Sequence, residues 1–222
     1  MASSSEVARD QILAVVRQAR VAGASSRTPA SPRRAIVPVD AQGLRLLFEN
    51  KMLGNLAQFS YLDSATELPL AVNRIAAAQG IANSAEVVVE QSLLHPEFDW
   101  SSQLVYPFRA GLPGAETVLG VSRVFAAIAE TGSLVLVSSP GAATSLNFLP
   151  NIHCVVLHSP QIVGTMEEVF ARLRQHYPQG LPRTVNFISG ASRTSDIEGR
   201  LLHGIHGPRH LHILWIGRHA PA

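Results

Sequence analysis

Two apolar stretches decide the fold, Cys154-Val-Val-Leu157 and Leu211-His-Ile-Leu-Trp-Ile216. They are nearly continuous in apolar residues instead of alternating, and Leu134–Val137 and Val185–Ile188 share this character. Continuous apolar strands are typical of a parallel sheet buried on both faces, and helices between the strands would provide that cover. The pattern predicts an open, mostly parallel α/β sheet flanked by helices.

The remaining elements follow from periodicity and from turn residues. Further strands are expected at Ile36–Val39 and Glu86–Gln91. The full bounds expected for the four apolar strands are Ser133–Ser138, Cys154–His158, Thr184–Ser189 and Leu211–Gly217. Helices are expected at about 41–58, 69–79, 117–129 and 163–175, with a short one from near Ser195. Residues 95–114 are rich in Pro and Gly and predict no regular element. Ligands of open α/β sheets bind at the carboxyl ends of strands, which directs attention to the loops after Ser138, His158, Ser189 and Gly217.

Residues 1–34 differ in composition from the rest of the chain. A helical pattern from Ser5 ends at Gly23, and a Ser-, Pro- and Arg-rich linker follows. The segment holds six arginines against Glu6 and Asp10, but no aromatic residue, so nucleic-acid binding is not expected. Two parts are therefore predicted, an N-terminal helix with a flexible basic linker at 1–34 and an α/β domain at 35–222.

Composition bounds the chemistry. The 222 residues are 46% hydrophobic and 15% charged, and no apolar run reaches the length of a membrane span. The single cysteine, Cys154, excludes an internal disulfide, a four-cysteine zinc site and a self-contained iron–sulfur cluster, which favours a reduced, cytoplasmic protein. The dinucleotide fingerprint, the phosphate-binding P-loop and the GxSxG elbow are absent, and Lys51 is the one lysine. No covalently bound cofactor is expected.

Residues 126–133, Ala-Ala-Ile-Ala-Glu-Thr-Gly-Ser, place Glu130 at a predicted helix-to-strand junction. Gly132 permits a positive φ, so the turn can direct the carboxylate at a cleft. Glu130 there would act as a base, a nucleophile or a hydroxyl-binding group. The alternative is structural: Glu130 bonds turn amides and Gly132 ends the helix.

A small-residue loop runs through Ser189-Gly-Ala-Ser-Arg-Thr-Ser-Asp-Ile-Glu198. Ser195 and Glu198 match a capping box, which predicts the start of a helix. A helix N-terminus preceded by small residues favours the binding of an anion. Arg193 would add a bidentate contact, whereas Asp196 would oppose an anion unless it binds a hydroxyl group or a cation. A capped helix with a polar loop is the structural alternative.

Four histidines lie in His203–His212, but Gly204, Gly207 and Pro208 break any helix that would space them as metal ligands. No metal site is therefore assigned, and His203 and His206 are candidates for a polar ligand site. Asn147 and His153 would face the same cleft as Glu130, or serve only in turn hydrogen bonds.

Five motifs in order resemble the lactate utilisation protein C family, the LUD-domain proteins. They are Ala129–Ser133, Pro150–His153, Ile162–Val163, Ser189–Glu198 and Gly204–Arg209. The resemblance covers about Ala35 to Gly217. It implies a fold similar to the glucosamine-phosphate deaminase, ribose-phosphate isomerase and CoA-transferase group. It also implies a role beside iron–sulfur or flavin-linked partner subunits that oxidise L-lactate to pyruvate.

The leading hypothesis is a cluster-free subunit of an L-lactate utilisation system that binds a small anionic ligand or cofactor beside iron–sulfur subunits. Glu130 would be catalytic, and a second set of residues would bind the ligand: Thr131, Gly132, Gly190, Ser192, Arg193, Thr194, Asp196 and His206. Two alternatives remain open. One is a stand-alone enzyme that uses Glu130 on a phosphorylated sugar or an acyl-CoA thioester, and the other is a non-catalytic assembly or regulatory protein.

Overall fold

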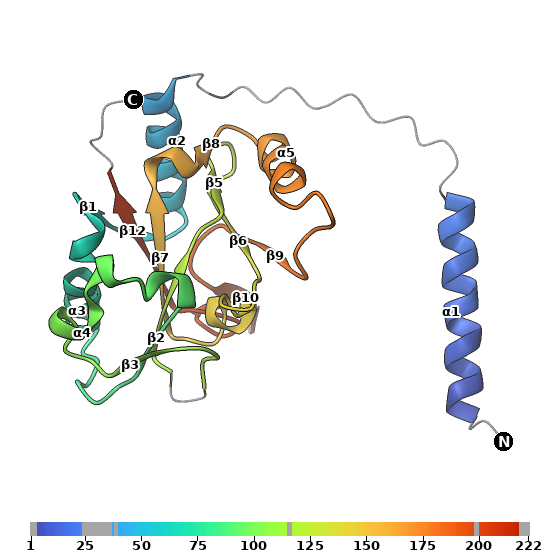
Figure 1. The fold of residues 1–222 in the computed structure, drawn as a ribbon, viewed down its shortest axis with the longest axis horizontal. Helices are drawn as coiled ribbons and strands as arrows, with labels where there is room; N and C mark the ends of the chain where they lie inside the picture. The colour runs from blue at the N-terminus through green and yellow to red at the C-terminus, as the bar shows by residue number, and fades with distance from the viewer. Residues whose placement is uncertain (1–3, 24–36, 38–39, 115–116, 198–199, 218–222) are drawn as a thin grey trace. The chain divides into compact units, whose positions relative to one another are not determined.

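The computed structural model describes residues 4–23, 37, 40–114, 117–197 and 200–217, excluding the side chains of 4–6, 19–23, 195–197, 200 and 201. The chain divides into two compact units, Met1–Ala35 and Ile36–Ala222 (Figure 1). The first holds α1 (Ser4–Gly23), which confirms the predicted helix. The predicted linker lies outside the described residues, as does the predicted strand at Ile36–Val39 apart from Val37. Among the described residues, no helix has the length and apolar character that a membrane crossing needs.

A six-stranded sheet forms the centre of the second unit, and all its neighbouring strands are parallel. In spatial order its strands are β1 (Gln58–Leu62), β12 (His210–Ile216), β7 (Ile152–His158), β4 (Leu119–Arg123), β2 (Val87–Val89) and β3 (Phe108–Ala110). The two apolar stretches pair with each other along their whole length, from His210 opposite Ile152 to Ile216 opposite His158. The predicted open, mostly parallel α/β sheet is confirmed.

A second sheet contains four strands in the order β8 (Ile162–Val163), β5 (Ala126–Ile128), β6 (Ser133–Val137) and β9 (Val185–Ile188). Here β6 is antiparallel to both β5 and β9, so the assignment of Leu134–Val137 and Val185–Ile188 to a parallel sheet was wrong. The physical reason is burial: β6 has apolar neighbours on both faces, which removes the alternation typical of antiparallel strands.

Two predicted helices are also wrong. The run 117–129 forms β4 and β5 instead, because its alanines are buried between two layers where small side chains let the layers approach. The segment from Ser195 belongs to a hairpin of β10 (Arg193–Ile197) and β11 (Arg200–His203). In that hairpin Thr194 pairs with Leu202, so tertiary pairing overrides the local capping signal.

Three helices cover the sheets in layers (Figure 1). On one face of the parallel sheet lies α3 (Leu68–Ala78), with apolar side chains of the segment 93–106. On the other face lie α2 (Ala41–Gly54) and the second sheet, and α5 (Met166–His176) covers the far face of that second sheet. Short elements complete the order: η1 (Ala65–Glu67), η2 (Gln91–Leu93), η3 (Pro96–Phe98), α4 (Trp100–Gln103), η4 (Thr144–Asn147) and η5 (Ser159–Gln161).

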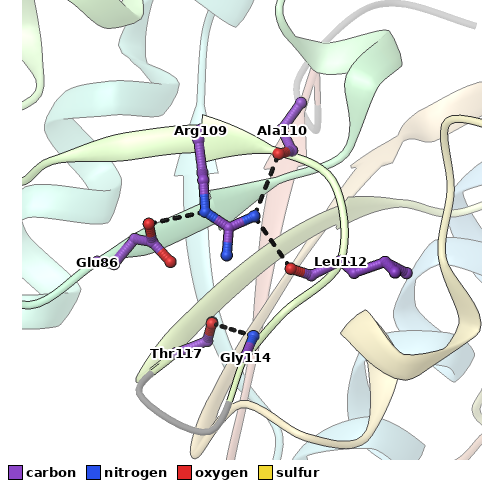
Figure 2. A network of polar contacts seen from close by, with 6 residues as sticks. All are labelled: Glu86, Arg109, Ala110, Leu112, Gly114 and Thr117. Atoms are coloured by element: carbon purple, nitrogen blue, oxygen red, sulfur yellow. Dashed lines mark hydrogen bonds and ion pairs between the residues drawn. The ribbon is translucent and has the colours of Figure 1, made fainter.

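The edge strand β3 is held by one arginine (Figure 2). Arg109 Nε donates to Glu86 Oε1 at 2.7 Å, and its Nη1 donates to the carbonyls of Ala110 and Leu112 at 3.3 and 3.0 Å. Nearby, the Gly114 amide donates to Thr117 Oγ1 at 2.9 Å. These bonds satisfy backbone groups of the segment that leaves the sheet edge and so fix its course.

The carboxyl end of α2 contacts two glycines of the second sheet. Gly132 has a φ of +63°, and a Cβ there would lie 2.5 Å from Lys51 Cβ. Gly190 has a φ of +142°, and its Cβ would lie 2.4 Å from the carbonyl oxygen of Asn55. Only glycine allows both the backbone conformation and the close approach at these positions.

We expect Gly190→Ala to lower the free energy of unfolding more than Gly180→Ala does. Gly180 has a similar φ, +137°, but no atom lies within 4 Å of the position a Cβ would take. Both variants carry about 1–3 kcal/mol of backbone strain, and the overlap with Asn55 adds about 1–3 kcal/mol to Gly190→Ala alone. Urea unfolding of the two variants measures the difference. Equal losses would show that the contact with α2 does not matter.

Candidate functional site

A cavity of about 250 Å³ lies at the amino ends of β7 and β12, where the loops after β9 and β11 meet. His153 and Leu211, the second residues of β7 and β12, form its floor. The cavity is lined by Asn147, Phe148, His153, Phe187, Ile188, Ser189, Gly190, Ser192, His206, Gly207, Pro208 and Leu211. Segments that are more than 50 residues apart in the sequence therefore form one concave surface.

His153 is the most deeply buried polar residue of this cavity, with no exposed surface. Its Nε2 shares a hydrogen bond of 2.7 Å with Ser122 Oγ of β4, while its Nδ1 has no partner among the described residues. Burial lowers the pKa of His153 to about 3, so the imidazole is neutral at pH 7. A neutral ring with one nitrogen unpaired can donate or accept one further hydrogen bond, depending on its tautomer.

The loops around the cavity are fixed by backbone hydrogen bonds. The Ser192 amide donates to the Pro208 carbonyl at 2.9 Å, and the Gly204 amide donates to the Ser192 carbonyl at 2.9 Å. A Cβ at Gly207 would lie 3.5 Å from Ser192 Cβ, which is ordinary contact. Ser192 is thus held between its own hairpin and the loop that carries His206.

The lining suits a small polar ligand. It offers the amide of Asn147, the hydroxyl groups of Ser189 and Ser192, and the imidazoles of His153 and His206. Phe148 and Phe187 add partly exposed rings, and no lysine or arginine side chain is among the lining residues. A ligand here would be bound by neutral hydrogen-bonding groups beside apolar side chains, an arrangement common in small-molecule sites.

The structure places the predicted ligand residues in different surroundings. Gly190, Ser192 and His206 line the cavity together. Arg193 instead directs its Nη2 to Asn55 Oδ1 at 3.3 Å, and Thr194 is buried in β10, so neither is a lining residue. The side chain of Asp196 lies outside the described residues.

Glu130 lies in the turn of the β5–β6 hairpin, which corrects the expected helix-to-strand junction. Its amide donates to the Gly164 carbonyl at 3.0 Å. The Gly132 amide donates to the Ile128 carbonyl at 3.0 Å and so closes the turn. The Glu130 side chain is half-buried and is not among the residues that line the cavity. No hydrogen bond or ion pair is seen for its carboxylate within the described part of the chain.

A chain of hydroxyl groups connects that turn to the cavity wall. Thr131 Oγ1 lies 2.8 Å from Ser133 Oγ, and Ser133 Oγ lies 2.7 Å from Ser189 Oγ. The sequence reasoning did not single out Ser133 or Ser122. Both are buried, and Ser133 directly precedes the apolar run Leu134–Val137, which is the signal that could have marked it in the sequence.

The C-terminal histidines separate in space. His203 and His210 line a smaller cavity of about 220 Å³ with Arg209, and His212 Nε2 bonds Ser60 Oγ at 3.2 Å. Burial, followed by the charge of His210, lowers the pKa of His212 to about 4. Over the residues that the structure describes, no group of three or more His, Cys, Asp or Glu side chains is placed to hold a metal ion.

We expect the free energy of unfolding to fall as the pH falls from about 6.5 toward 3. The unfolded chain protonates His153 near its ordinary pKa of 6.5 while the folded chain does not, so the group removes up to about 1.4 kcal/mol of stability for each pH unit. His212 acts in the same direction. His153→Asn should flatten the dependence between pH 6.5 and 5, measured by urea unfolding. His203→Asn, at an exposed histidine, should not flatten it, and an unchanged slope in the His153→Asn variant would contradict the assignment.

Comparison with known proteins agrees with this fold. The LUD domain family matches residues 115–216, which include the Glu130 turn and all the residues that line the cavity. Lactate utilization protein C of Deinococcus radiodurans is 30% identical over 200 residues, covering 87% of this chain and 90% of that relative. Lactate utilization protein C of Shouchella clausii is 38% identical over 82 residues, covering 36% of each chain.

A solved structure supports the same relationship. The crystal structure of a DUF162 family protein from Deinococcus radiodurans has a TM-score of 0.60 and 25% identity, covering 81% of this chain and 100% of that chain. Sequence similarity over nearly the whole of one relative and a shared fold lead to one conclusion. The chain belongs to the LUD-domain family, together with the proteins named lactate utilization protein C.

Proposed function

We propose that this chain is a cytoplasmic, cluster-free subunit of an L-lactate utilisation system and binds a small anionic ligand beside iron–sulfur partner subunits. The observation that carries the proposal is the cavity at His153. It joins Asn147, Ser192 and His206 from three separate loops beside the buried His153. The names of the relatives in the family supply the metabolic context.

The cavity matches the chemistry of a 2-hydroxy acid. The hydroxyl group of such a ligand would bond the imidazole of His206, and the carboxylate would accept bonds from the Ser192 hydroxyl and the Asn147 amide. A methyl group would contact the phenyl rings of Phe148 or Phe187. Neutral donors bind a monoanion without a buried counter-charge, although less tightly than an arginine would.

Oxidation of lactate to pyruvate removes two electrons and two protons, so an electron acceptor is required. The one cysteine of this chain, Cys154, is fully buried, and burial raises its thiol pKa to about 12. A buried thiol of this kind does not supply a metal-binding thiolate or a redox-active pair. Under the proposal, the electrons therefore pass to the iron–sulfur subunits, and this chain holds the ligand.

A second candidate function, acyl transfer in which Glu130 attacks a thioester carbonyl, forms a mixed anhydride and releases the thiolate, is favoured by one observation. The carboxylate is half-buried in a rigid hairpin turn, and within the described residues it has no hydrogen-bonding partner. A carboxylate held in this way is available to a substrate. This candidate predicts thioester turnover by the purified chain alone.

We expect purified chain to restore L-lactate-dependent dye reduction in host extracts that lack it. Ser192→Ala should restore it about tenfold less well, because the variant loses one hydrogen bond to a charged ligand group. Ser101→Ala, an exposed serine of α4, is the matched control and should behave as the unaltered chain. If dye reduction does not depend on the chain, the lactate role is rejected. If Ser192→Ala has full activity, only the assignment of ligand binding to this cavity is rejected.

Glu130→Gln tests the hairpin turn in the same extracts and in a thioester assay of the isolated chain. If Glu130 acts chemically, the variant loses at least about a hundredfold in rate, with its unfolding midpoint unchanged. Glu167→Gln removes the same charge from an exposed position on α5 and should keep full activity. Equal rates for the two variants would restrict Glu130 to a structural role.

A further inference from the structure

A larger cavity, of about 720 Å³, lies at the carboxyl ends of the parallel strands β2 and β4. Glu90 follows β2 directly, and Arg123 is the last residue of β4. The opposite wall is formed by α5 and by the segment after β6. Open α/β sheets bind ligands at this edge, and no lining residue is shared with the cavity at His153.

Glu90 provides a fixed acceptor in this cavity. Glu90 is buried, with 8% of the residue exposed, and its two carboxylate oxygens accept bonds from Ser92 Oγ at 2.6 Å and from the Arg123 amide at 2.8 Å. The Glu90 amide in turn donates to the Val121 carbonyl at 2.8 Å. A carboxylate accepts about four hydrogen bonds, so Glu90 retains capacity for the hydroxyl groups of a ligand.

Two arginines supply positive charge to the same cavity. Arg123 extends from the end of β4 and Arg172 from α5, and both residues are exposed. The ion pairs seen among the described residues, such as Arg109–Glu86, do not involve Arg123 or Arg172. Guanidinium groups without a carboxylate partner are suited to bind a phosphate in a bidentate manner.

Aromatic rings complete the lining. Phe125, His176 and Tyr177 contact one another, with ring centroids 4.9 Å apart for His176 and Tyr177 and 6.2 Å apart for Phe125 and Tyr177. These three residues line the same cavity as Arg123 and Arg172. Such a cluster can stack a planar ring of a ligand.

We propose that this cavity binds a nucleoside phosphate. The phosphate contacts Arg123 and Arg172, the ribose hydroxyl groups donate to Glu90, and the base stacks on the rings of Tyr177 and its neighbours. The cavity volume lies within the range found for small-molecule binding sites. The site is separate from the one in the proposed function, so each can fail without the other.

Calorimetric titration of the full chain at 0.15 M salt, where long-range electrostatics are screened, tests the proposal. The probes are AMP, ribose 5-phosphate and inorganic phosphate. We expect AMP to bind at least about fivefold more tightly than ribose 5-phosphate because of base stacking. Arg172→Gln should weaken AMP binding about tenfold or more.

Arg174→Gln is the matched control, because Arg174 is exposed on the same helix but does not line the cavity. It should bind AMP as the unaltered chain does. If both variants weaken AMP binding equally, the effect comes from the net charge of α5, and the proposed site is rejected. Equal affinity for all three probes, or no binding of any of them, would reject a nucleoside phosphate.

Discussion

The close contact between the carboxyl end of α2 and two glycines is the constraint on which the candidate site depends. Lys51 and Asn55 occupy the space that side chains at positions 132 and 190 would need. This contact brings the β5–β6 turn and the loop after β9 against the same helix. Phe48 and Met52 of α2 also belong to the buried cluster that contains residues of both sheets. The loop after β9 that α2 contacts in this way carries Ser189, Gly190 and Ser192 of the cavity at His153.

Two cavities lie at opposite ends of the parallel strands and differ in chemistry. The one at the amino ends of β7 and β12 is lined by neutral hydrogen-bonding groups and phenyl rings. The one at the carboxyl ends of β2 and β4 holds two arginines and a buried carboxylate. Under the two proposals, the chain would hold a small organic acid and a larger phosphorylated ligand at the same time. The described contacts give no shared residue through which one ligand would displace the other.

Several features of the fold could be predicted from local pattern. The strands β7 and β12 and the helices α2, α3 and α5 correspond to predicted elements, because apolar runs and helical periodicity reflect burial directly. The β5–β6 hairpin could not be predicted in the same way. Ala126–Ala129 combines high helix propensity with complete burial, and the sheet pairing with Ser133–Val135 decides its conformation. The helix expected from Ser195 failed for the same reason, since pairing with β11 outweighs a capping signal.

By itself, the sequence determined the α/β class, the family, the presence of a single cysteine and the loops that carry polar residues. These properties depend on residue type and order, which are explicit in the chain. Only the tertiary structure decided that Gly190, Ser192 and His206 share a cavity while Arg193 bonds Asn55 and Glu130 lies in a separate turn. Side-chain neighbours depend on strand order and on the packing of α2, and these arise from contacts between residues far apart in the chain. Distances of that kind leave no local pattern in a single sequence.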